Sequence, residues 1–349
     1  MRHNAARRPT IKEVASVAGV STQTISRVIN ERPDVSPETR KRVQEVIKKL
    51  GYRPSALARS LIRQRSLTLG VVTAGLRYIG PSRTLSGIAA AAEEAGYSLL
   101  LKELSRFDED DVEPIFQALL SHHADGIIWA VPEVGANHAW VNEFALNLEY
   151  PLVCLTMEPR QNISVVSIDN YLGGRMATSH LLEQGYRKIG HISGPLDWWE
   201  ARQRMTAWRD VLQEAGCEVK DNHTVEGNWS SASGAQVIEK LFDQYQDMDS
   251  IFVANDQMAL GVIRFVAQRG LRIPEDLGIV GFDNIAETDF FSPALTTIQQ
   301  DQHGVAKLAV EEIVKIIESS WQESEQIEPR TILVPPTLVV RQSSVRGTY

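Results

Sequence analysis

The strongest constraint on the fold is a series of short, almost wholly apolar runs that recur from Leu67 onward. The runs are LTLGVVT, SLLLKEL, DGIIWAV, PLVCLT, RKIGHIS, SIFVAN and LGIVGFD, and stretches with helical periodicity separate them. A strand that is apolar at nearly every position is buried on both faces, which is typical of a parallel sheet covered by helices. These β-α units are too many for one small sheet. We therefore predict an α/β protein with two doubly wound parallel-sheet lobes and a ligand cleft at the carboxyl ends of the strands.

Charge is divided unequally along the chain. Residues 1–65 contain 15 Lys and Arg against 5 Asp and Glu, a balance of +10. The whole chain has 36 against 44, so the remainder has 21 against 39, a balance of −18. A compact basic segment attracts a polyanion that an acidic body repels, so we expect the amino-terminal end alone to bind nucleic acid. On charge alone, a solvated basic tail is the alternative.

The basic segment carries start and stop signals for short helices. Thr10 and Glu13 form a capping box at the start of the first helix, and Ser21 caps a second one after a short turn. A third helix begins after Ser36, where proline follows the cap, and stops at Gly51. Short helices joined in this way predict an all-α helix-turn-helix unit.

The second of these helices carries the side chains that can recognise DNA. Opposite its apolar stripe lie Thr22, Gln23, Ser26 and Arg27. Glutamine pairs with adenine and arginine with guanine or phosphate in the major groove, while the helix N-terminus favours an anion. A plain helical bundle with a polar face is the alternative.

Residues 10–30 and 35–61, TIKEVASVAGVSTQTISRVIN and VSPETRKRVQEVIKKLGYRPSALARSL, resemble the DNA-binding headpiece of the lactose/galactose repressor (LacI/GalR) family. The resemblance implies a repressor that binds double-stranded operator DNA. It also implies a hinge helix in the second stretch, which folds when two copies meet over DNA, and whose leucine wedges into the minor groove and bends the site. The residues it implies for DNA contact are Thr10, Ser21, Thr22, Gln23, Ser26, Arg27, Asn30, Ala58 and Leu61. An ordinary apolar linker residue is the alternative for Leu61.

The rest of the chain resembles the effector-binding core of the same family, which is itself similar to periplasmic sugar-binding proteins. The matching stretches are DGII, IDN, ANDQMALG, VGFDN and PALTTIQQD. Position by position, the resemblance implies that Arg204, Trp229, Asn255, Asp283 and Gln300 contact a small-molecule effector. It places Tyr78, Pro81 and Ile168 on an apolar wall. Thr156 and Ala74 stand where β-galactoside-binding members have acidic and hydroxyl contacts, so that specificity is not carried over.

These residue types suit a saccharide, because a sugar presents hydroxyls in its ring plane and apolar C–H faces. The charge of Asp283 should need compensation from Arg204 or from ligand hydroxyls. Trp198 and Trp199 are adjacent on an expected loop and cannot both be buried cheaply, so we expect Trp198 to flank the cleft and extend the stacking surface. The alternatives are a helix cap for Asp283, core packing for Trp229, and a purine or other nucleobase-derived effector in place of a sugar.

The resulting organisation has three parts. We expect a helix-turn-helix domain over residues 1–52, a hinge over 53–65 and an effector-binding core over 66–349. Within the core, we expect the N-lobe to comprise about 66–167 and 301–329, and the C-lobe about 168–300 and 330–345. No heptad-bearing helix follows the last strand, so we expect a homodimer without further association through a coiled coil.

Other function classes lack their signatures. We find no GxxxxGK[ST], GxGxxG, GxSxG or HExxH, so we expect no enzyme, cofactor or metal site. Only two cysteines occur, Cys154 and Cys217, and no apolar run is long enough for a membrane span or secretion signal, which together favour the cytoplasm. A sugar-binding module without DNA binding is the remaining alternative, but the basic headpiece argues against it.

Overall fold

The computed structural model describes residues 9–29, 32–52, 65–107, 111–135, 137–143, 150–321 and 327–346. The chain divides into two compact units, Met1–Leu67 and Thr68–Tyr349. We call the first the headpiece and the second the core, and each has hydrophobic clusters of its own.

The described part of the headpiece is helical, as expected. It contains α1 (Ile11–Ala18), α2 (Thr22–Ile29) and α3 (Pro37–Leu50). Their apolar faces meet in a small core with Val14, Ile25 and other buried side chains. This arrangement confirms the predicted helix-turn-helix.

The predicted helix ends are also confirmed. The hydroxyl of Thr10 accepts from the backbone N–H of Glu13, whose carboxylate accepts in turn from the Thr10 N–H at 2.7 Å. The Ser21 hydroxyl accepts from the backbone N–H at the third position of α2, and Ser36 caps α3 in the same way. Gly51 ends α3 with φ of 62°, a left-handed conformation that costs glycine little.

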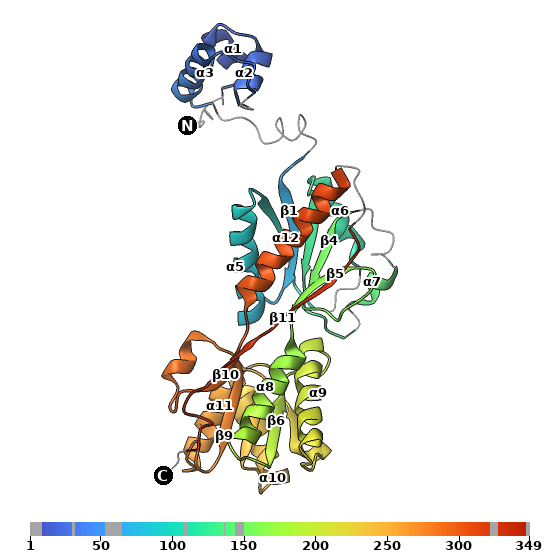
Figure 1. Cartoon of the computed structure of the whole chain (residues 1–349), viewed down its shortest axis with the longest axis vertical. Helices are drawn as coiled ribbons and strands as arrows, with labels where there is room; N and C mark the ends of the chain where they lie inside the picture. Colours follow the sequence, from blue (N-terminus) through green and yellow to red (C-terminus); the bar gives the residue numbers. More distant parts are fainter. Residues whose placement is uncertain are drawn as a thin grey trace, which may run out of the picture. The chain divides into compact units, whose positions relative to one another are not determined.

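The core contains two sheets. In the N-lobe the strand order is β11-β5-β4-β3-β1-β2 and every described pairing is parallel. The helices α5 and α12 lie side by side on one face of this sheet (Figure 1). Its elements are β1 (Thr68–Ala74), α5 (Ile79–Glu94), β2 (Ser98–Leu104), α6 (Glu113–Ser121), β3 (Gly126–Ala130), α7 (Ala139–Glu143), β4 (Leu152–Leu155), β5 (Ser164–Ile168), α12 (Gln302–Trp321) and β11 (Thr331–Val334).

The C-lobe repeats this arrangement with the order β12-β10-β9-β8-β6-β7. Its edge strand β12 is antiparallel to β10, whereas the other pairings are parallel. Its elements are α8 (Asn170–Glu183), β6 (Ile189–Ser193), α9 (Trp199–Glu214), the 3-10 turn η2 (Asp221–His223), β7 (Thr224–Glu226), α10 (Ser231–Gln244), β8 (Ser250–Val253), α11 (Asp256–Gln268), β9 (Gly278–Asp283), the 3-10 turn η3 (Ala286–Phe290), β10 (Thr296–Gln299) and β12 (Thr337–Val339).

The two parallel-sheet lobes confirm the predicted fold class, but one boundary needs correction. We expected residues 330–345 to belong to the C-lobe. Instead β11 pairs with β5, with Thr331 opposite Val165, so the chain passes to the C-lobe only after Val334. The run TILV is short and its neighbours are polar or proline, so the sequence does not show which sheet takes it up.

In each lobe the strand order reverses once, between β1 and β3 and between β6 and β8. Crevices at the carboxyl ends of strands beside such a reversal are the usual ligand sites of doubly wound sheets. None of the helices in the described ranges has the length and apolar character needed to span a bilayer.

Candidate effector cavity and DNA-reading helix

A cavity lies between the two lobes at the carboxyl ends of their strands. It encloses about 870 Å³ of empty space including its opening to solvent, within the usual size of a small-molecule site. Every residue predicted to contact the effector lines it. These residues are Tyr78, Pro81, Ile168, Trp198, Arg204, Trp229, Asn255, Asp283 and Gln300. The structure thus brings the predicted set together around one space.

Parallel strands explain why residues so far apart in sequence meet here. Tyr78 follows β1, Ile168 ends β5, and Trp198 follows β6. Asn255 follows β8 and Asp283 ends β9. Because parallel strands all end on one edge of their sheet, the residues after them face one crevice.

Arg204 is the central cation of the cavity. It projects from α9, is 5% exposed, and donates from Nε to Asn170 Oδ1 at 2.9 Å and from an Nη to the Ala254 carbonyl at 2.6 Å. Its guanidinium lies 3.7 Å from the centre of the Phe282 ring. Burial lowers its pKa, and the carboxylate of Asp283 is the main opposing influence. The guanidinium is therefore fixed before any ligand arrives, which favours precise recognition.

The charge of Asp283 is only partly compensated, and Gln300 rather than Arg204 supplies the direct hydrogen bond to it. Arg204 acts on it only through space. Burial raises the pKa of Asp283 to about 6, and Arg204 is the largest of the groups that lower it. Burial, with repulsion from Asp283, also raises the pKa of the neighbouring Asp256. A ligand hydroxyl that donates to Asp283 would stabilise its charged form.

Asn255, and not Asp283, is the helix cap. Its Oδ1 accepts from the Met258 N–H at 2.9 Å at the start of α11, while its Nδ2 donates to the Trp229 carbonyl at 3.0 Å. The cap considered for Asp283 is absent, because the turn η3 that follows β9 is preceded by Ile285 and has no side-chain cap. The Asn255 side chain holds the backbone of Trp229 in place, and one amide proton is left for a ligand.

Trp229 is 8% exposed, and its ring packs directly against the backbone of Gly194, the residue after β6. A Cβ added to Gly194 would lie only 2.0 Å from this ring. Both Trp229 and Asp283 adopt positive φ, 69° and 118°, which is costly for residues other than glycine. Strained backbone of this kind clusters at ligand sites. The cavity therefore contains an aromatic plate and a carboxylate, each held in an unfavourable conformation by its surroundings.

The expectation that Trp198 and Trp199 cannot both be buried is wrong. They are 9% and 5% exposed, because Trp198 immediately precedes α9 and Trp199 is its first residue, not part of a free loop. Trp198 nevertheless lines the cavity, edge-on to Trp229 with ring centres 5.8 Å apart.

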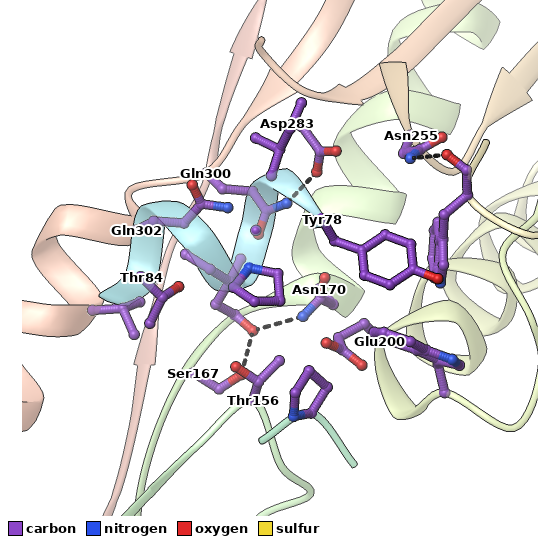
Figure 2. A pocket seen from close by; sticks show the side chains of 18 of the residues that line it. Tyr78, Thr84, Thr156, Ser167, Asn170, Glu200, Asn255, Asp283, Gln300 and Gln302 are labelled. Carbon is purple, nitrogen blue, oxygen red and sulfur yellow. Dashed lines mark hydrogen bonds between the residues drawn. The ribbon is translucent and has the colours of Figure 1, made fainter. Parts of the chain in front are cut away.

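Several polar residues of the cavity were not predicted, among them Asn170, Glu200 and Gln302. Figure 2 shows the polar groups of Asn170 and Glu200 directed into the same space. Buried polar atoms without a hydrogen-bond partner are found on three lining residues: Glu200 Oε2, Trp229 Nε1 and Gln302 Oε1. A carboxylate one helical turn before a buried arginine was the only sequence signal for Glu200.

The lobes touch each other beside this cavity. The Trp199 N–H donates to the Glu133 carbonyl at 3.1 Å, and the Gly135 N–H donates to the Asp197 carbonyl at 2.9 Å. The Glu133 carboxylate, 1% exposed, lies 3.0 Å from Arg160 in its own lobe and 3.6 Å from Arg202 on α9. These contacts connect the segment that carries Trp198 and Glu200 directly to the opposite lobe.

In the headpiece, the side chains predicted to read DNA lie on one surface of α2. Thr22, Gln23 and Arg27 are exposed and Ser26 is half-buried. The Arg27 guanidinium lies 3.3 Å from Asp34, in an exposed ion pair that contributes little stability and can give way to a phosphate or base.

The hydroxyls predicted to contact phosphate have a second role. Thr10 and Ser21 are exposed, but both hydroxyls already accept N–H bonds as helix caps. Asn30, Ala58 and Leu61, with the expected hinge over 53–65, fall largely or wholly outside the described residues. Among the residues that are described, no group of His, Cys, Asp and Glu could hold a metal ion.

Comparison with known proteins agrees with this architecture. The family described as bacterial regulatory proteins, lacI family, matches residues 10–55, and a periplasmic binding protein-like domain matches residues 178–344. The HTH-type transcriptional repressor PurR of Aliivibrio salmonicida (strain LFI1238) is 33% identical over 335 residues, which cover 96% of this chain and 98% of the relative. The ribose operon repressor of Escherichia coli (strain K12) is 32% identical over 327 residues, covering 93% and 98%.

Solved structures give the same result. The lac repressor dimer bound to operator and the anti-inducer ONPF superimposes with a TM-score of 0.87 at 29% identity, covering 97% of this chain and all of that one. A transcriptional regulator CelR–cellobiose complex matches with a TM-score of 0.69 at 29% identity, over 96% of this chain and all of that one. With a matching headpiece, a matching core and relatives that are repressors over nearly their whole length, this chain belongs to the lacI family of bacterial regulatory proteins and is a DNA-binding transcriptional repressor with an effector-binding core.

Proposed function

We propose that the effector of this repressor is a saccharide bound in the cavity between the lobes. The observation that carries the proposal is the set of unpartnered buried atoms on Glu200, Trp229 and Gln302. Each such group costs about 1–3 kcal/mol when left unpaired. Gln302 Oε1 is an acceptor and Trp229 Nε1 is a donor, while Glu200 Oε2 accepts when ionised and can donate when protonated, since burial raises the pKa of Glu200 to about 7. The ligand that satisfies all three atoms must therefore both donate and accept hydrogen bonds.

A saccharide meets this requirement directly, because each hydroxyl can donate and accept and several are spread around the ring. Its apolar face also suits the Trp229 ring, while Arg204 and Asp283 supply charged partners for hydroxyls. Two of the similar proteins also support a sugar effector: one is a ribose operon repressor, and the other is a regulator in complex with cellobiose. A purine or other nucleobase would also stack on Trp229, and it remains the second candidate.

We propose that α2 supplies the base contacts to the operator. Gln23, Thr22 and Arg27 read base edges in the major groove, assisted by Ser26, while Thr10, Ser21 and Asn30 contact phosphates. Two copies of the chain bind the two half-sites of an operator as a homodimer in the cytoplasm, with Ala58 and Leu61 of paired hinge segments at the minor groove.

Linkage connects the two sites. Effector in the cavity favours one relative orientation of the lobes, and this orientation changes how well the two hinge segments can form over the operator. A coupling of about 1–3 kcal/mol is typical of allosteric proteins and would change operator affinity by roughly 5- to 150-fold.

The test is a thermal-shift screen of the full-length protein against saccharides and purine nucleobases, followed by operator titration with each hit. We expect at least one saccharide to raise Tm and change operator affinity, and Asp283→Asn to weaken this response at least tenfold, since a hydrogen bond to a charged group is worth about 1.5–3 kcal/mol. Tyr150→Ala, an exposed site outside the cavity, is the control and should respond as the wild type does. Stabilisation by purines alone would contradict the proposal.

A further inference from the structure

A second, more open cavity adjoins the first. It holds about 1470 Å³ including its mouth and shares Tyr78 and Trp198 with the inner one. Segments 75–78 and 103–107 of the N-lobe line it, and Asp197 of the C-lobe closes the other side. We propose that this outer cavity is a subsite for a further sugar unit of an oligosaccharide effector whose first unit occupies the inner cavity. The inference rests on the saccharide proposed above.

A continuous series of aromatic rings connects the two cavities. Trp229 lines the inner cavity and Phe107 lines the outer one, with Trp198 between them. The ring centre of Trp198 is 5.8 Å from that of Trp229 and 4.9 Å from that of Phe107. Tyr78 adds a ring at 5.9 Å from Trp198. Consecutive sugar units each present an apolar face, so a ligand that follows this series can contact aromatic surface in both cavities.

Phe107 is held in place before any ligand binds. Its ring lies against Gly75, where an added Cβ would be 2.3 Å from Phe107 Cζ, and Gly75 has φ of 69°. The Asn137 side chain donates to the Phe107 carbonyl at 2.7 Å. A ring fixed by a close glycine and a buried amide loses little entropy on binding, so it can contribute affinity.

The charged groups of the outer cavity favour an uncharged ligand. Arg77 and Arg106 carry positive charge, Glu103 and Asp197 carry negative charge, and the four line the cavity together. An Nη of Arg77 donates to the Tyr78 hydroxyl at 3.0 Å. Mixed charges offer both donors and acceptors to hydroxyls but give a phosphate or carboxylate no net attraction. We therefore assign the subsite to neutral oligosaccharides rather than sugar phosphates or acidic sugars.

The experiment measures affinity as a function of ligand length. Isothermal titration calorimetry with the full-length protein would compare glucose, cellobiose and cellotriose, and in parallel maltose and maltotriose. In the series that binds, we expect one added unit to tighten binding by roughly three- to tenfold, the range given by one aromatic contact. Phe107→Ala should abolish that gain and leave the Kd of the shortest bound saccharide within about twofold, whereas Phe107→Tyr should keep the gain.

The outcomes distinguish a failure of the subsite from a failure of the saccharide effector. Saccharide binding that does not depend on length, or a Phe107→Ala variant that weakens every ligand equally, would overturn the subsite and leave the saccharide effector intact. Binding of no saccharide in either series or in the thermal-shift screen, with an unchanged protein in circular dichroism, would overturn both. Equal tightening by a sugar phosphate and its neutral counterpart would contradict the assignment to uncharged ligands.

Discussion

At the scale of single residues, Glu200 shows how the cavity sets the properties of a side chain. Burial raises the pKa of Glu200 to about 7, with nearby Glu133 also raising it, while its own backbone N–H and Arg204 lower it. Because the folded state holds this proton more tightly than the unfolded chain does, Glu200 favours folding most below its ordinary value of 4.5. That contribution is lost as the pH rises through about 7.

Glu200→Gln removes the titration and should therefore change how stability depends on pH. At about pH 5 the variant and the wild type should unfold with similar free energies, and at about pH 8 the variant should be more stable by up to about 3 kcal/mol. Urea unfolding at both pH values measures this difference.

The control for this prediction is Glu214→Gln at the end of α9. The Arg175 guanidinium lowers the pKa of Glu214, so this group stays charged between the two pH values and its replacement should have the same effect at both. A Glu200→Gln variant whose advantage did not grow with pH would show that Glu200 is already ionised in the folded protein at the lower pH.

At the scale of elements, the residues of the proposed sites lie at strand ends and helix starts. The cavity residues sit where strands end, and close backbone approach is possible at these points only with small residues. Gly194, directly after β6, is the clearest case because the Trp229 ring occupies the space where its Cβ would be. On the headpiece, α2 likewise presents its exposed residues from a short helix fixed by the Ser21 cap.

Gly194→Ala should displace the Trp229 ring. Overpacking of this kind costs roughly 1–3 kcal/mol of stability, and the ligand-induced rise in Tm should shrink as well. Gly80→Ala is the matched control for stability, because the nearest atom to its Cβ is 3.7 Å away on a flexible side chain and its φ is not positive. Equal unfolding free energies for the two variants would contradict the account of Gly194.

Gln23→Ala should separate base reading from phosphate binding. Loss of one bidentate contact should weaken operator binding by about 1–3 kcal/mol, while affinity for random duplex and the salt dependence stay unchanged because glutamine is uncharged. Gln44→Ala on the exposed face of α3 is the matched control. Electrophoretic titration with both duplexes measures the effect, and a parallel loss on random DNA would assign Gln23 to the backbone contacts.

At the scale of the whole molecule, the headpiece is basic and the core is acidic, which favours separate sites for DNA and for a small molecule. Residues 1–65 carry a balance of +10 and the remainder −18. The headpiece and the core each have their own hydrophobic clusters, so we expect ligand binding in the core not to require the headpiece. Operator binding, in contrast, should depend on headpiece charge and hence on salt.

A core fragment of residues 66–349 should keep the effector-induced rise in Tm and lose specific operator retention. For the full chain, operator affinity should fall on the order of a thousandfold between about 50 and 200 mM salt, as expected when several phosphates are neutralised. Filter binding measures operator retention and its salt dependence, and a thermal-shift assay measures the rise in Tm. Operator retention by the fragment, or a flat salt dependence of the full chain, would overturn the division of roles.

Much of the fold could be predicted because its signals are local. The caps at Thr10, Ser21 and Ser36 and the stop at Gly51 depend on neighbours within one helical turn, and they are all found as expected. Each of the apolar runs forms a strand, and all of these strands except the exposed edge strand β2 are mostly buried, because burial on both faces requires apolar residues whatever the neighbouring strands are. Five strands lie outside these runs and escaped detection. Of these, β7, β11 and β12 lie at sheet edges, where half-exposed residues are tolerated, whereas β5 and β10 are interior strands that mix apolar residues with serine, threonine or glutamine.

The sequence by itself thus determined the helix ends, the buried strands, the separation of charge and, through resemblance, which residues surround the cavity. Tertiary structure alone decided what those residues do to one another: that Asn255 is a cap, that Gln300 and not Arg204 bonds Asp283, and that Trp198 and Trp199 are both buried. It also placed β11 beside β5. Burial and hydrogen bonding across the cleft join residues up to hundreds of positions apart, and no local pattern records which partner a side chain will meet.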